Sequence, residues 1–93
     1  MKLAISALGQ DLHSNLDLRF GRAQYFIVYD LESETFEAIE NQGFTARGGA
    51  GIATAPQLLG QAISGVISGN FGPNAYELLR DGGVRMYKAE ERP

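Results

Sequence analysis

The sequence lacks cysteine and tryptophan altogether, and it has a single histidine, His13. Without cysteine the chain can form no disulfide, offer no thiolate to a metal and use no cysteine nucleophile. A metal site built by this chain alone would therefore consist mostly of carboxylates, unless another chain or the ligand completed it. These absences narrow the function more than any residue type that is present.

Strong charge and long apolar runs are also missing. The formal net charge is −3, so no overall field attracts nucleic acid or an anionic membrane, and neither is expected as a partner. No apolar run approaches the roughly 20 residues that a membrane span requires. The first five residues already enter a predicted strand and leave no room for a signal peptide, which predicts a cytoplasmic protein. The length predicts one domain over residues 1–93.

The first half of the chain predicts a meander of three strands. Residues 2–7 alternate between larger apolar side chains and small or polar ones, as a strand does. A long polar connection over residues 8–24 leads to the aromatic and β-branched run at 25–30. After a short turn, residues 35–41 form the third strand. Short connections favour antiparallel neighbours.

The second half alternates helices and strands. After a glycine-rich loop at 42–51, apolar residues recur at helical spacing up to Ala62 or Ile63, where this helix is predicted to end. Its start has two readings. Thr54 can cap a helix with Pro56 in the first turn, whereas a start near Ala50 puts Pro56 where it costs a hydrogen bond. A strand at 65–70, a helix at 73–81 and a strand at 84–89 follow.

The element order β-β-β-α-β-α-β predicts an α/β protein with a ribonuclease-H-like sheet. Right-handed crossovers give the strand order 3-2-1-4-5, with only the second strand antiparallel to the others. Both helices then lie on one face. Apolar residues on both sides of the second strand indicate that the other face is covered as well. We expect a second copy of the chain there, giving a homodimer, or a further segment of the chain, and we place Val28 on this face.

The same topology gathers several loops at one rim of the sheet. The long connection, the glycine-rich loop and the residues after the fourth strand meet there, and both helices begin there with unpaired backbone N–H groups. Three arginines lie in these segments, so the rim is predicted to bind an anion. The candidate binding residues are His13, Arg19, Phe20, Gly21, Arg22, Arg47, Gly48, Gly49, Gly51, Asn70 and Gly72.

Each candidate also has a purely structural interpretation. Arg19 and Arg22 can pair with Asp11 or Asp17 at the surface. The glycine cluster lacks the lysine and hydroxyl of a P-loop, so it can be a turn that allows close helix packing. His13 in a polar loop is either solvated or a metal ligand and proton donor at the rim. Asn70 can satisfy local backbone groups.

Three blocks of sequence resemble the dinitrogenase iron–molybdenum cofactor biosynthesis family, the small domain of NifX and of the C-terminus of NifB. They are FGRAQYFIVYD, RGGAGIATAPQLL and GVISGNFGPNAYELLRDGGVRMY. The resemblance runs from the first strand to the last. It implies a ribonuclease-H-like fold and a non-enzymatic carrier of an iron–sulfur or iron–molybdenum cofactor precursor. It also implies partners among cofactor-assembly proteins.

This chain departs from the family in lacking cysteine and in ending soon after the fifth strand, where relatives commonly continue into another helix. Binding would then depend on His13, the arginines and backbone amides, which suits a preassembled anionic cluster. Two alternatives stay open: a dimeric regulatory or scaffold domain, and a binder of a phosphorylated small molecule at the glycine-rich loop. A ribonuclease-H-like nuclease is disfavoured, because the first strand offers no carboxylate for a two-metal site.

Overall fold

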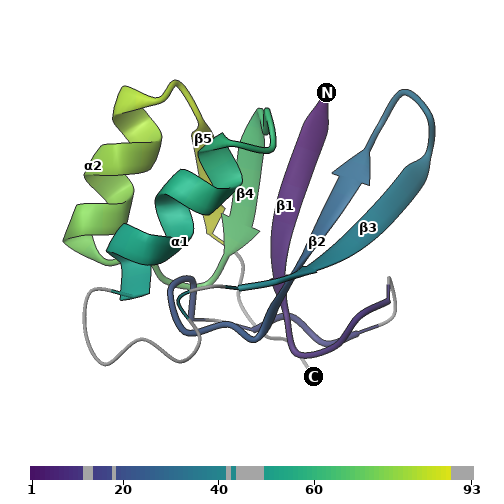
Figure 1. The fold of residues 1–93 in the computed structure, drawn as a ribbon, viewed down its shortest axis with the longest axis horizontal. Helices are drawn as coiled ribbons and strands as arrows, with labels where there is room; N and C mark the ends of the chain where they lie inside the picture. Colours follow the sequence, from purple (N-terminus) through teal and green to yellow (C-terminus); the bar gives the residue numbers. More distant parts are fainter. Residues whose placement is uncertain (12–13, 18, 42, 44–49, 89–93) are drawn as a thin grey trace.

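A five-stranded mixed sheet carries both helices on one face (Figure 1). The computed structural model describes residues 1–11, 14–17, 19–41, 43 and 50–88, with the backbone alone at 50–52. The strand order is β3-β2-β1-β4-β5, and β2 alone runs opposite to the other four strands, which confirms the predicted fold. The elements are β1 (Lys2–Ala7), β2 (Tyr25–Asp30), β3 (Thr35–Glu40), α1 (Ala50–Leu59), β4 (Gly65–Ser68), α2 (Pro73–Asp81) and β5 (Arg85–Lys88).

The bounds of β1, β2 and α2 agree with the sequence prediction, whereas the other strands are shorter than predicted. β3 ends at Glu40, one residue early, because Asn41 turns its side chain to other partners. β4 stops at Ser68 rather than residue 70, and β5 covers 85–88 rather than 84–89. No helix among the described residues has the length and apolar character needed to cross a membrane.

Helix α1 takes the earlier of its two possible starts and ends at Leu59, three or four residues before the predicted end at Ala62 or Ile63. Pro56 lies inside the helix, and Thr54 is an interior residue rather than a cap. Gly60 N–H still donates to the Pro56 carbonyl at 3.1 Å, but Ala62 has a φ of 57°. A left-handed residue stops a right-handed helix, so the apolar spacing at 62–63 continued past the end of the helix.

The core lies between the helices and the side of the sheet that carries small residues on β1. Ala4 is fully buried there, beside Val28 on β2 and Val66 on β4, and Phe26 on β2 lies on the same face. Ala55 and Leu58 of α1 and Ala75 and Leu79 of α2 complete the same cluster. Small side chains on the central strand allow the helices to approach closely. Val28 belongs to this cluster, so its predicted place on the opposite face is wrong.

The opposite face of the sheet, here called the open face, is apolar. Ile5 of β1 pairs with Ile27 of β2 and with Ile67 of β4, and Leu3 pairs with Tyr29. Phe36 on β3 and Tyr87 on β5 are 43% and 46% exposed on the same side. Within the described residues no helix covers this face.

Replacing Pro56 by alanine should stabilise the protein. Proline in a helix interior leaves the carbonyl of residue 52 without its helical N–H partner, at a cost of about 3 kcal/mol, and part of the gain is lost through a more flexible unfolded chain. We expect the free energy of unfolding of Pro56→Ala, measured by urea denaturation, to rise by about 1–2 kcal/mol. An unchanged or lower value would instead indicate a helix that begins at Pro56.

Candidate functional site

The long connection between β1 and β2 returns to the carboxyl ends of β1 and β4. Asp17 N–H donates to the Ser6 carbonyl at 3.0 Å, and Leu16 forms a bridge with Ala7. Three residues further on, Phe20 N–H donates to the Asn70 carbonyl at 3.2 Å. The predicted meeting of this connection with the residues after β4 is therefore observed.

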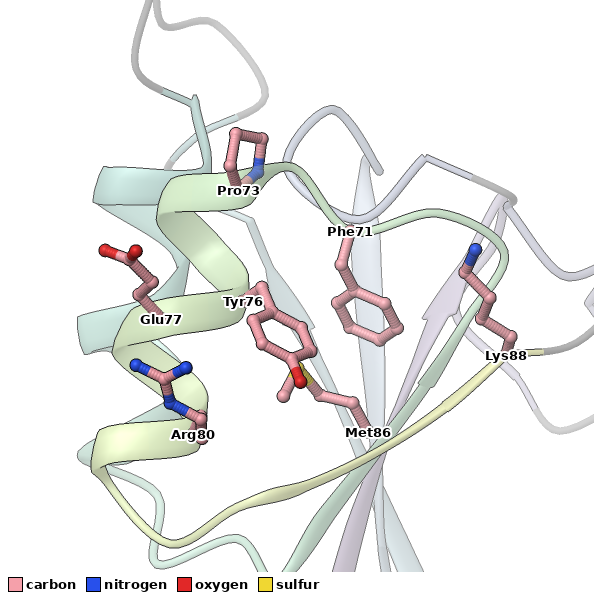
Figure 2. A pocket seen from close by; sticks show the side chains of 7 residues that line it. All are labelled: Phe71, Pro73, Tyr76, Glu77, Arg80, Met86 and Lys88. Carbon is pink, nitrogen blue, oxygen red and sulfur yellow. The ribbon is translucent and has the colours of Figure 1, made fainter.

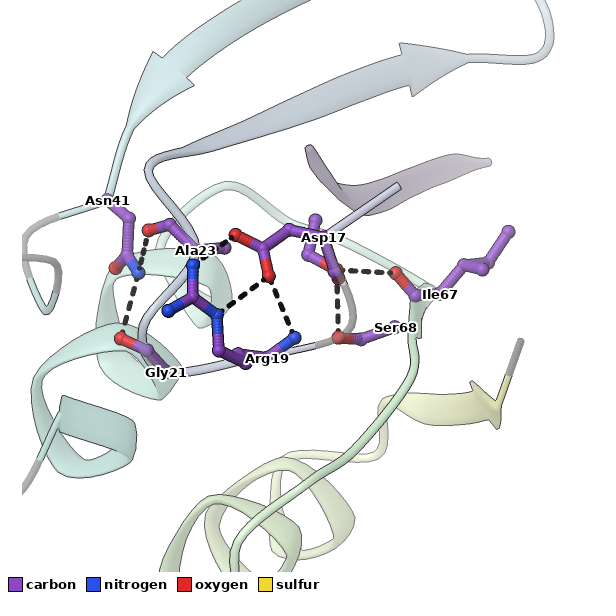
Figure 3. Close-up of polar contacts among 8 residues, drawn as sticks. Asp17, Arg19, Gly21, Ala23, Asn41, Ile67 and Ser68 are labelled. Carbon is purple, nitrogen blue, oxygen red and sulfur yellow. Dashed lines mark hydrogen bonds and ion pairs between the residues drawn. The ribbon is translucent and has the colours of Figure 1, made fainter. Parts of the chain in front are cut away.

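Two buried serines hold this connection to the sheet. Ser6 Oγ lies 2.8 Å from Ser68 Oγ and 2.5 Å from the carbonyl oxygen of Asp17 (Figure 3). A hydroxyl has one proton to donate, so Ser6 can donate to Asp17 while it accepts from Ser68. Ser6 and Ser68 are fully buried, so bulk water does not compete for these hydrogen bonds. They join β1, β4 and the connection at one point.

Arg19 is held by Asp17, in agreement with the structural interpretation of this arginine. Its Nε lies 3.1 Å from Asp17 Oδ1 and its Nη2 lies 3.2 Å from Oδ2, a two-point contact (Figure 3). The hydrogen bond and the charge of Asp17 raise the pKa of Arg19. The Arg19 side chain is 65% exposed, whereas Asp17 is buried, so the pair lies at the surface of the rim. Arg22, three residues on, is exposed.

Phe20 and Gly21 contribute to the site through the backbone that they position. Phe20 is 1% exposed, and its ring packs edge-on against Phe26, with a centroid distance of 5.4 Å. It also lies 5.2 Å from the ring of Phe71. An aromatic residue so deeply buried presents no surface to a ligand. It instead holds the connection against Phe71, two residues before α2 begins.

Asn41 is a buried junction that sequence reasoning missed. Its Nδ2 donates to the carbonyls of Gly21, at 3.0 Å, and Ala23, at 2.7 Å (Figure 3). Its Oδ1 accepts from Gly43 N–H at 2.9 Å and from Thr54 Oγ1 at 2.6 Å. All four hydrogen-bonding positions of the amide are thus used. The sequence prediction placed Asn41 at the end of the third strand, and a polar residue at that position was its one signal.

The N-terminus of α2 faces the same rim. Gly72 is the N-cap residue in an extended conformation, and no side chain caps the helix. The first-turn N–H groups therefore point out of the helix without an intrahelical acceptor. A Cβ on Gly72 would meet nothing within 4 Å, so this glycine leaves the helix entry open rather than relieving a clash.

The remaining candidates are only partly covered by the structure. His13, Arg47, Gly48 and Gly49 lie outside the described residues, and Gly51 is described as backbone within α1. Asn70 is exposed, and its carbonyl accepts the Phe20 hydrogen bond. Over the described ranges, no three His, Asp or Glu side chains converge as a metal site would require.

Comparison with known proteins identifies the family. The model of the family described as dinitrogenase iron-molybdenum cofactor matches residues 1–93, and the chain belongs to this family. It is 30% identical over 92 residues to the uncharacterised protein MJ0580 of Methanocaldococcus jannaschii, covering 96% of this chain and 77% of that one. The resemblance inferred from the sequence is thereby confirmed.

Two solved structures are similar in both fold and sequence. The apo form of the orange protein from Desulfovibrio gigas superposes with a TM-score of 0.87 at 32% identity, covering 91% of this chain and 72% of that one. A putative NifB protein from Thermotoga gives a TM-score of 0.82 at 38% identity, with 96% and 76% of the two chains covered. These relatives support a family role in the biosynthesis of iron–molybdenum cofactor or in binding a cluster-like ligand.

Asn41→Ala should destabilise the protein strongly, because it leaves the carbonyls of Gly21 and Ala23 without their buried donors. We expect the free energy of unfolding to fall by about 2–4 kcal/mol in urea denaturation. The matched variant Asn70→Ala, at an exposed asparagine, should change it by about 0.5 kcal/mol or less. Equal effects of the two variants would show that the Asn41 junction contributes little.

Proposed function

We propose that this protein binds and carries a preassembled anionic iron–sulfur cluster, of the iron–molybdenum cofactor precursor type, at the rim. One observation carries the proposal. Asn41 fixes the backbone on both sides of the exposed Arg22. The same connection is hydrogen-bonded to the carbonyl of Asn70, two residues before Gly72, the N-cap of α2, which has no side-chain cap. A cation and free backbone donors on a rigid frame suit a polyanion.

The chemistry of the residues supports a carrier of finished clusters rather than a site of cluster assembly. Assembly normally takes thiolates, and the sequence has none. Arg22 is an exposed cation on backbone that Asn41 holds from both sides, and we associate the cluster with it. Such a carrier makes and breaks no covalent bond in its cargo, so we propose a non-enzymatic role. His13, Arg47 and the glycines of the 42–51 loop remain proposed contributors.

A carrier of this kind would exchange its cargo with cofactor-assembly proteins, and we propose these as partners in the cytoplasm. A small phosphorylated molecule would use the same exposed cation and backbone donors. The family's association with iron–molybdenum cofactor favours the cluster over the phosphate as the ligand.

Substitution of Arg22 should weaken cluster binding. Anaerobic titration with an isolated iron–molybdenum cofactor precursor, followed by visible absorption and gel filtration, should show the chromophore eluting with the wild-type protein. Arg22→Ala should bind it about tenfold more weakly, because one charge-assisted contact is lost.

Arg85→Ala serves as the matched control for this titration, because it removes the same charge at the opposite end of the sheet. It should bind like the wild type. Excess inorganic phosphate should compete poorly with the cluster. Strong competition would favour the phosphorylated ligand, and a folded protein that retains no chromophore would contradict the carrier function for this cargo.

The open face favours a second role, in dimer formation. Leu3, Ile5 and Ile67 are half-buried on it around the buried Ile27, and exposed Phe36 and Tyr87 flank them. Surfaces of this kind usually mark an interface. We propose that two copies pack through their open faces, and that the dimer could act as a scaffold even without a ligand.

Phe36→Asp should disrupt this dimer, because it places a charge at the packed face. Sedimentation should find the wild type as a dimer and Phe36→Asp as a folded monomer. Tyr76→Asp, at an aromatic residue of similar exposure on α2, should remain dimeric. A wild type that stays monomeric at high concentration would rule out the dimer.

A further inference from the structure

Strand β5 is an edge of the sheet, and the proposed function does not use it. It pairs with β4 alone. Arg85 N–H donates to the Ser64 carbonyl at 3.1 Å, so Arg85 and Tyr87 direct their backbone groups toward β4. The N–H and C=O groups of Met86 and Lys88 therefore point outward, where no described strand pairs with them.

A cleft of about 630 Å³ lies between this edge and α2. Phe71 and Tyr76 point into it above Met86, and Lys88 stands at one end (Figure 2). Its volume lies in the range of sites that bind a substantial side chain or small ligand. The two residues whose backbone groups face outward, Met86 and Lys88, also line the cleft with their side chains.

Helix α2 extends over the cleft. Pro73, Tyr76 and Arg80 follow each other at helical spacing on the side of α2 that lines it. Tyr76 is 48% exposed, and the Arg80 guanidinium lies 5.7 Å from its ring centroid. A strand added next to β5 would have the side chains on its helix side covered by this aromatic surface. The fold thus has room for one more strand under α2.

The charges on β5 indicate what such a strand would carry. Arg85 lies on the open-face side and Lys88 on the helix side, and β5 contains no acid. Lys88 makes no ion pair with any residue in the described part of the chain. Opposite residues of an antiparallel pair share one face, so a second β5 would place its own Met86 or Lys88 opposite the Lys88 of the first copy and bring no acid to the edge. The edge therefore suits an acidic partner better than a second copy, which offers no opposite charge.

We propose that β5 and this cleft bind an extended segment of a partner protein, added as an antiparallel sixth strand. The segment presents an acid, two apolar residues and a second acid in succession. These face Lys88, Tyr87, Met86 and Arg85 in that order, so each charged residue meets its opposite and the apolar residue opposite Met86 enters the cleft under Tyr76. Main-chain hydrogen bonds then supply affinity and the cleft supplies selectivity.

A blocked hexapeptide with the sequence Thr-Glu-Val-Phe-Glu-Thr is the probe. Titrated into the wild-type protein, it should shift the backbone amide resonances of Met86 and Lys88 and saturate them. Lys88→Glu and Tyr76→Ala, both at exposed positions, should each weaken binding by about fivefold or more while the spectrum stays folded. The matched charge change Lys2→Glu, on another strand, should have little effect.

Two N-methylated versions of the probe test the strand pairing itself. In the proposed register the first Glu and the Phe direct their N–H groups at β5, while the Val and the second Glu direct theirs away. Methylation of the first pair should weaken binding about tenfold or more, and methylation of the second pair should be tolerated. A peptide with both acids replaced by lysine should not bind.

Three results would overturn the proposal. Equal binding of the two methylated peptides would mean that the cleft recognises side chains without strand addition. Amide shifts at Met86 and Lys88 that depend on protein concentration alone would mean that a second copy occupies the edge. Loss of peptide binding in Arg22→Ala, but not in Lys88→Glu, would place the peptide at the rim. The cluster titration does not depend on peptide binding, so either proposal can be contradicted while the other stands.

Discussion

The amide of Asn41 connects three parts of the chain that lie far apart in the sequence. It holds the carbonyls of Gly21 and Ala23, the N–H of Gly43 and the hydroxyl of Thr54. Because a buried amide with four partners tolerates little movement, the backbone that carries Arg22, the end of β3 and the body of α1 are fixed relative to each other. The rim keeps its shape because this one side chain is satisfied.

Local patterns in the sequence were enough to predict the sheet. The run at 25–30 and the helix at 73–81 were found with correct bounds, because aromatic alternation and a Pro–Gly frame are strong local signals. The face of β1 that receives the helices was not predictable in this way. Leu3 and Ile5 are on the more apolar side of β1, yet the helices pack on Ala4, where small residues allow close approach. The face on which the helices pack depends on how the sheet and helices fit together, and the spacing of apolar residues along one strand does not contain that information.

The candidate site was predictable as a place and less so as a set of contacts. Topology placed the connection beside Asn70, and the structure contains that hydrogen bond. The engagement of Arg19 by Asp17 and the burial of Phe20 depend on how the connection folds back, and an aperiodic polar segment gives no sign of that. Asn41 and Ser6 were overlooked for a related reason. A lone polar residue at a strand end has many possible partners until the neighbouring segments are in place.

The paired serines beneath the connection bear on how a ligand could enter. Ser6 and Ser68 tie Asp17 to the two central parallel strands with no water between them. The part of the connection at Asp17 is therefore attached directly to the sheet, and we expect it to open less readily than a segment that contacts only solvent. If the proposed carrier function holds, a cargo would meet a surface that is already formed here, and the strength of its contacts rather than a movement of Asp17 would set its exchange rate.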